Sequence, residues 1–157
     1  MKDTIVLGLG NVLMGDEGIG VRIVKELEST CGERFPQVDF VDAGVGGMRL
    51  LHRIAGRRRA IFIDCARMDA EPGTIRRFTP DQVRTRKGLA HRSLHEADLL
   101  HILDLSRQLG ECPREVVLFG IEPERIAEGI GLSPCLEARL GEYVGLVTEE
   151  LGVADEA

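Results

Sequence analysis

The sequence predicts an α/β protein with a mainly parallel sheet that carries helices on both faces. Apolar runs typical of strands alternate with helical patterns along most of the chain, and this alternation favours parallel strands joined by helices. The runs at 60–64 (AIFID) and 116–120 (VVLFG) are apolar almost throughout, so we expect them inside the sheet with both faces covered. The length of 157 residues, with 43% hydrophobic residues, fits one domain, which we expect to span residues 1–157.

The individual elements follow from apolar periodicity and from turn and cap signals. We expect strands at 4–7, 38–41, 60–64, 74–78 and 116–120, of which 74–78 is the more polar and so nearer an edge. We expect helices at 17–30, 48–54, 93–109 and 134–151, with Gly152 ending the last one. Ser93 and Glu96 form a capping box, Ser133 and Pro134 are an N-cap and first-turn pair, and the polar segment 79–90 is expected to be a loop.

The segment 4–20, TIVLGLGNVLMGDEGIG, organises the chain. It predicts a strand, a glycine-containing turn and the start of a helix. Gly8 and Gly10 are expected to allow a sharp turn where a Cβ would clash. Asp16 stands where an N-cap belongs and Glu17 falls in the first turn, where helix N–H groups favour carboxylates. In an open α/β sheet this is the edge at which ligands bind.

Composition excludes several classes of function. The net charge of −6 argues against a nucleic-acid partner, and no apolar run is long enough to span a membrane. The four cysteines are scattered without a Cys-x-x-Cys pair, so we expect reduced thiols and a cytoplasmic location. The glycines lack the third position of a dinucleotide fingerprint, where Leu13 stands, so nucleotide binding is a weaker alternative.

Three side chains are candidate metal ligands. Glu17 follows the first strand, Asp64 ends the third, and His95 opens the helix after the Ser93 cap, where the positive helix end favours a neutral imidazole. The carboxyl ends of parallel strands meet at one edge, so two carboxylates and one imidazole can form an open site for nickel or zinc. Each residue alone also fits a structural role, and His91 is the reserve candidate. A reactive Cys65 next to Asp64 is a further alternative.

The sequence resembles the nickel-iron hydrogenase maturation endopeptidases, which trim the C-terminal tail of the hydrogenase large-subunit precursor. The likeness covers GLGNVLMGDEGIGVRIVKEL, DAGVGGMRLL, FIDCARMDAEPGTIRRF, SLHEADLLHIL and GIEPERIAEGIGLSPCLEARL, in the family's order. It implies a three-layer α/β/α sandwich around a twisted, mostly parallel five-stranded sheet. It also implies that Glu17, Asp64 and His95 form the metal-binding trio and that the protein is an aspartic-type endopeptidase with Glu17 and Asp64 in catalysis.

The resemblance implies that the nickel arrives already bound in the precursor and that the enzyme alone holds no tightly bound metal. Gly44, Gly46 and Gly47 would let the precursor backbone approach, and the segment 79–90 would choose among precursors. Two alternatives stay open at this point. One is a nickel-binding chaperone of the large subunit that does not cut, and the other is a nucleotide-dependent enzyme on a Rossmann-like sheet.

Overall fold

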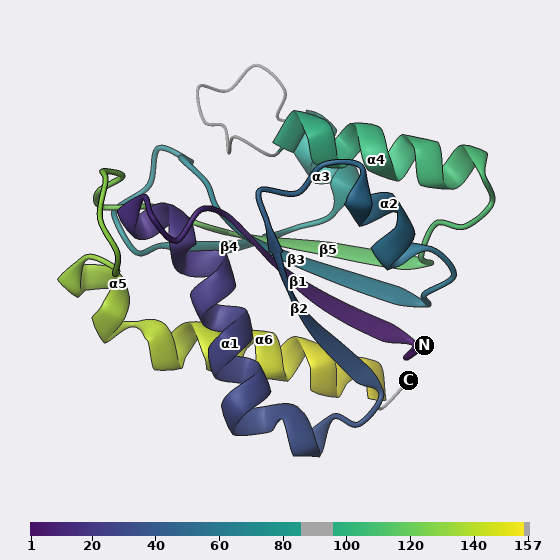
Figure 1. The fold of residues 1–157 in the computed structure, drawn as a ribbon, viewed down its shortest axis with the longest axis horizontal. Helices are drawn as coiled ribbons and strands as arrows, with labels where there is room; N and C mark the ends of the chain where they lie inside the picture. The colour runs from purple at the N-terminus through teal and green to yellow at the C-terminus, as the bar shows by residue number, and fades with distance from the viewer. Residues whose placement is uncertain (86–95, 156–157) are drawn as a thin grey trace.

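The computed structural model describes residues 1–85 and 96–155 and confirms the predicted α/β class. The strands are β1 (Thr4–Leu9), β2 (Val38–Gly44), β3 (Arg59–Cys65), β4 (Ile75–Phe78) and β5 (Glu115–Ile121). They form one sheet in the order β2-β1-β3-β5-β4 (Figure 1). All neighbouring pairs are parallel except β4 with β5, which is antiparallel, so the more polar strand lies at an edge as predicted.

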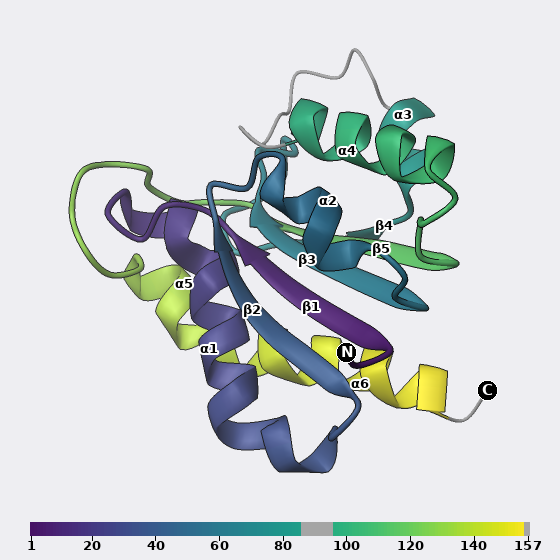
Figure 2. The same cartoon turned by 45° about the vertical axis from the view of Figure 1, so that its right-hand side comes forward.

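Helices cover both faces of this sheet. They are η1 (Gly15–Gly18), α1 (Ile19–Cys31), η2 (Gly32–Arg34), α2 (Arg49–Ile54), α3 (Pro80–Thr85), α4 (Glu96–Gln108), α5 (Pro134–Ala138) and α6 (Leu140–Asp155). Helices α1 and α6 lie on one face and α2 and α4 on the other (Figures 1 and 2). Within the described residues, none of these helices has the length and apolar character needed to cross a membrane.

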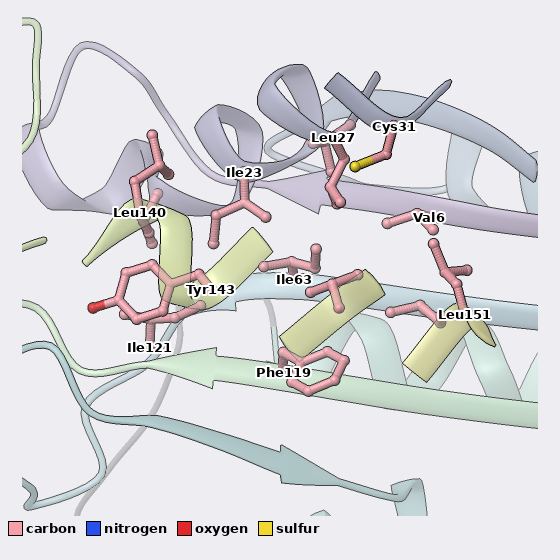
Figure 3. Packing of buried hydrophobic residues seen from close by; sticks show 14 of the residues in the cluster. Val6, Ile23, Leu27, Cys31, Ile63, Phe119, Ile121, Leu140, Tyr143 and Leu151 are labelled. Atoms are coloured by element: carbon pink, nitrogen blue, oxygen red, sulfur yellow. The ribbon is translucent and has the colours of Figure 1, made fainter. Parts of the chain in front are cut away.

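A hydrophobic core lies on each face of the sheet. The strands contribute to both cores because successive side chains point to opposite faces. Val6 packs toward α1 and α6, whereas Ile5 and Leu7 pack toward α2 and α4. In the same way Ile61 and Ile63 face the first core, which Tyr143 and Leu151 of α6 close from the other side (Figure 3). The central strands are therefore covered on both faces, as their apolar sequences predict.

The ends of the strands form two further edges of the sheet, at right angles to its outer strands β2 and β4. Different segments of the chain lie at these two edges. The parallel strands β1, β2, β3 and β5 end at one edge, and the segments 10–18, 45–48, 66–74 and 122–133 leave the sheet there (Figure 1). The chain begins at the opposite edge, where the carbonyl of Asp3 accepts hydrogen bonds from the N–H groups of Arg58 and Arg59. Helix α6 also ends on that side of the molecule (Figure 2).

The segment 79–90 was predicted to be a loop, and this is wrong for its first part. Residues 80–85 form helix α3, and residues 86–90 lie outside the described part of the chain. The Thr79 N–H donates to the Gln82 side chain (2.8 Å), and the Gln82 N–H donates to the Thr79 hydroxyl (3.4 Å). Thr79-Pro80-Asp81-Gln82 is therefore a capping box with proline at the first helical position, which the polar composition obscured.

The last predicted helix is broken and longer than expected. Arg139, with φ −100° and ψ 4°, separates α5 from α6, and this change of direction allows Leu136 and Leu140 to reach the same core. Helix α6 then continues through Gly152 to Asp155, so the prediction that Gly152 ends the helix is wrong. At the other end of the chain, the predicted helix at 17–30 starts with the short turn η1, and α1 proper begins at Ile19.

A partly buried ion-pair network joins α6 to the sheet edge where the chain begins. Arg59 is 1% exposed, and its guanidinium donates to the Glu150 carboxylate and to the Glu150 carbonyl, both at 2.7 Å. Arg77 of β4 donates to the same carboxylate. The hydrogen bond from Arg77, and then the positive charges of Arg77 and Arg59, lower the pKa of Glu150 below its ordinary value. This carboxylate therefore stabilises the fold in its ionised form.

Replacing Glu150 by Gln should lower the free energy of unfolding by about 2–3 kcal/mol at pH 7, because Arg59 stays buried without its main partner. The folded-state pKa lies below the unfolded value of 4.5, so the stabilisation is present above 4.5 and is lost as the pH falls through the folded pKa. Urea unfolding at several pH values measures the difference. The control is Glu142→Gln, which removes a similar but exposed pair with Arg139 and should change stability little. Equal losses in both variants, or a difference that does not shrink in acid, would contradict this role.

Candidate functional site

Helix α1 approaches the sheet so closely that only glycine fits at the contact. A Cβ on Gly20 would lie 2.1 Å from the Ile63 carbonyl oxygen and 2.6 Å from the Leu9 carbonyl oxygen. A Cβ on Gly8 would lie 2.4 Å from the Gly20 carbonyl oxygen. Gly8 therefore serves this close approach and not the sharp turn that its position predicted. The contact places η1, which precedes α1, over the ends of β1 and β3.

Glu17 lies in η1 directly above the turn that follows β1. Gly10 has φ +127°, and a Cβ there would lie 1.9 Å from the Glu17 carbonyl oxygen, so the turn predicted at Gly10 is confirmed. Glu17 is 7% exposed, which is unusual for a carboxylate in a surface turn. The backbone thus fixes Glu17 close to the sheet edge.

Asp64 is the penultimate residue of β3 and is partly buried at the same edge. Gly20, three residues after Glu17, lies against the carbonyl of Ile63, the residue before Asp64, so Glu17 and Asp64 stand at the same edge. The neighbouring Cys65 is buried there as well. Its burial, and then the negative charges of Asp64, Asp16 and Glu17, raise the pKa of the Cys65 thiol far above its ordinary value. The structure therefore brings the carboxylates of the first motif and of the third strand to one place.

His95 and His91 lie outside the described residues. Helix α4 begins at Glu96, immediately after His95 in the sequence, and its first turn lies on the side of the molecule where β1 and β3 end (Figure 1). Among the residues that the structure describes, no group of three or more His, Cys, Asp or Glu side chains could hold a metal ion. Glu17 and Asp64 lie at the same edge of the sheet, and the metal-binding trio stays a prediction.

Asp16 does not cap its own helix, so that prediction is wrong. Its side chain makes no hydrogen bond to the first turn of η1 or α1. Its carboxylate is fully buried and instead accepts from the N–H groups of Glu124, Arg125 and Ser133 and from the Ser133 hydroxyl. Sequence reasoning missed these partners because they lie 108–117 residues away and three of the four donors are backbone N–H groups, which carry no sequence signal.

The end of β2 and the loop after it carry the three glycines predicted to contact substrate: Gly44 is the last residue of the strand, and Gly46 and Gly47 follow in the loop. Gly44, Gly46 and Gly47 have φ values of +53°, +82° and +92°, and the Gly10 N–H donates to the Gly44 carbonyl. A Cβ on Gly44 or Gly47 would meet no heavy atom within 4 Å, so the backbone conformation, not a lack of space, calls for glycine there. The loop is thus tied to the turn beneath Glu17.

The rim of this edge is apolar. Five exposed hydrophobic side chains project from the loops after β1, β2 and β5: Val12, Leu13, Val45, Met48 and Ile130. A surface hollow of about 320 Å³ lies beside η1 and is lined by Gly15 and residues 124, 125 and 127–134. The edge therefore combines buried carboxylates with an apolar border and an open hollow.

Comparisons with known proteins agree on one family. The model of the hydrogenase maturation protease family, HycI, matches residues 21–150. The chain is 38% identical over 144 residues to the hydrogenase 2 maturation protease of Escherichia coli, covering 87% of this chain and 82% of that protein. It is 34% identical over 124 residues to the hydrogenase expression/formation protein HoxM of Cupriavidus necator, covering 79% of this chain and 61% of that protein. The chain thus spans less than two thirds of the length of HoxM.

The fold gives the same result over nearly the whole chain. The solved structure of the hydrogenase maturating endopeptidase HybD from E. coli superimposes with a TM-score of 0.82 and 32% identity. The superposition covers 98% of this chain and 94% of that one.

The raised pKa of Cys65 predicts an unreactive thiol. Because only the thiolate is nucleophilic, native protein treated with iodoacetamide at pH 8 should be alkylated at the half-buried Cys112 and Cys135 long before Cys65. Peptide mass mapping over time measures each site, and the urea-unfolded protein is the control in which all sites react. Alkylation of native Cys65 as fast as that of Cys112 would restore the reactive-thiol alternative.

Proposed function

We propose that this chain, which belongs to the hydrogenase maturation protease family, is an endopeptidase that removes the C-terminal tail of the nickel-loaded large-subunit precursor of a NiFe hydrogenase. The observation that carries the proposal is the position of Glu17 and Asp64 at one sheet edge of this fold, where Gly20 lies against the Ile63 carbonyl. The family model matches residues 21–150, a range that contains positions 64 and 95, and the superposition on HybD covers almost the whole chain. Family membership argues against the nucleotide-dependent alternative.

The nickel belongs to the substrate in this proposal. Glu17, Asp64 and His95 complete the coordination of an ion that the precursor carries in, and no tightly bound metal is expected in the enzyme alone. Carboxylate oxygens and an imidazole nitrogen suit a borderline divalent ion such as nickel. The position of His95 in the sequence, directly before α4, supports its assignment because that helix starts on the side of the molecule where β1 and β3 end.

Water is the proposed nucleophile. The high thiol pKa disfavours Cys65, which leaves the two carboxylates and the nickel to activate the attacking group. Either Glu17 or Asp64 takes a proton from water, or the nickel lowers the pKa of a water that it binds. The docked nickel brings the scissile bond beside the carboxylates and so supplies the proximity that the reaction needs.

The border of the site fits a polypeptide substrate. At Gly44, Gly46 and Gly47 the backbone carries no side chain, so the precursor backbone can approach these positions closely. The exposed apolar side chains around the edge, Val45 and Ile130 among them, can contact the apolar parts of the precursor. We place this reaction in the cytoplasm, where the scattered cysteines stay reduced.

Glu17→Gln and Asp64→Asn should each leave a folded protein that processes a nickel-loaded precursor at least about 10²-fold more slowly, because each removes a ligand and a base while keeping the shape of the side chain. Intact mass of the precursor over time measures tail removal, and circular dichroism checks folding. The exposed Asp104→Asn on α4 is the matched control and should cleave normally. Normal tail removal by both site variants would refute the assignment, and a wild-type protein that binds the precursor without shortening it would favour the chaperone alternative.

Removal of nickel from the precursor should abolish cleavage, although the enzyme needs no added metal. The reason is that the ion, in this proposal, aligns the scissile bond with Glu17 and Asp64. The experiment compares nickel-loaded precursor with precursor made in nickel-depleted cells, using the same chelator-treated enzyme. Efficient cleavage of the nickel-free precursor would contradict recognition of the metal.

A further inference from the structure

The buried Asp16 carboxylate binds two distant segments of the chain together. Its Oδ2 accepts from the N–H groups of Glu124 and Arg125 and from the Ser133 hydroxyl, each at 2.9 Å, and its Oδ1 accepts from the Ser133 N–H at 2.7 Å. All four partners are donors, which matches a carboxylate, a group that only accepts when ionised. Such charge-assisted bonds are stronger than those between neutral groups, and leaving them unmade inside a protein is costly.

The backbone continues this connection. The Asp16 N–H donates to the Arg125 carbonyl, the Gly15 N–H to the Gly129 carbonyl, and the Gly129 N–H to the Leu13 carbonyl. The segment 13–16 and the segment 122–133 are therefore held side by side at several points, and Figure 2 shows the chain after β5 passing next to η1 before it reaches α5.

Ser133 also binds Asp16 and not its own helix. It is the N-cap of α5, with Pro134 at the first helical position, yet its side chain makes no capping hydrogen bond. Its hydroxyl donates to Asp16 instead. An N-cap serine usually satisfies a free N–H of its own helix, so its use here indicates that the position of α5 is set by η1.

We propose that Asp16 is a positioning residue for the reaction: it fixes Glu17, the next residue, by fastening η1 to the segment 122–133. This inference rests on the proposed function of Glu17. Glu17 shares its short turn with Asp16, and no side-chain hydrogen bond caps this turn, so the turn must be held from outside. A displacement of about 1 Å in a reacting group is enough to lower a rate about 10²-fold.

The test uses Asp16→Asn, which keeps the size of the side chain but sets an NH₂ group against N–H donors. Its kcat for a nickel-loaded precursor should fall about 10²-fold while KM changes less than about threefold, because the substrate-binding border remains. Hydrogen exchange measured by mass spectrometry should show lost protection in peptides covering 10–20 and 122–134 together. Glu150→Gln is the matched control, since it removes a buried carboxylate at the opposite edge and should lower stability while leaving kcat unchanged.

Several outcomes decide the proposal. A folded Asp16→Asn protein with wild-type kcat, or one whose exchange changes in neither peptide, would overturn it, as would an equal loss of kcat in Glu150→Gln. If Asp16→Asn does not fold, Ser133→Ala and Ser133→Thr decide: a lower kcat in the first that is restored in the second supports the proposal, and wild-type kcat in both overturns it. A wild-type protein that fails to cleave would instead refute the proposed function, while the exchange comparison would still test the fastening.

Discussion

The structure depends on how closely α1 packs against the sheet. The backbone of Gly20 touches the carbonyl groups at the ends of β1 and β3, and Gly8 leaves room for this contact from the side of β1. Any side chain at these two positions would push the helix outward, and η1 would move with it. The distance between Glu17 and the end of β3 is therefore a consequence of two missing Cβ atoms. The glycine-rich motif is best understood as a packing device that also delivers an acidic residue.

Carboxylates have different partners at the two edges formed by the strand ends. At the edge where the chain begins, the buried Arg59, Glu150 and the half-exposed Arg77 form an ion-pair network that joins α6 to β3 and β4. At the other edge, the polar groups hold loops in place: Asp16 fastens 122–133, and Glu122 accepts from the Met68 and Ala70 N–H groups. Carboxylates thus stabilise one end through arginines and organise the other through backbone N–H groups.

Much of the fold could be predicted from the sequence, because its signals are local. Runs such as AIFID and VVLFG identify the inner strands, and the polar 75–78 identifies the edge strand. Glu17 and Asp64 could be predicted as a pair because parallel strands deliver their ends to one edge. The predictions that were wrong concern features set by packing or by contacts between distant parts of the chain. Helix α3 is only six residues long and its polar sequence resembles a loop, and the break at Arg139 serves the packing of α5 and α6 against a shared core. The hydrogen bonds of Asp16 could not be predicted from the sequence because its partners lie more than one hundred residues away.

The placement of the chain ends has a practical consequence. Met1 is 86% exposed, and both the start of β1 and the end of α6 lie far from the acidic edge (Figures 1 and 2). Strand β3 has seven residues, so at about 3.3 Å per residue the two edges are separated by about 20 Å. An affinity tag, a fluorophore or a surface tether attached at either end would leave the loops free, whereas a peptide fused there would need a linker long enough to travel the full height of the sheet before it reached Glu17.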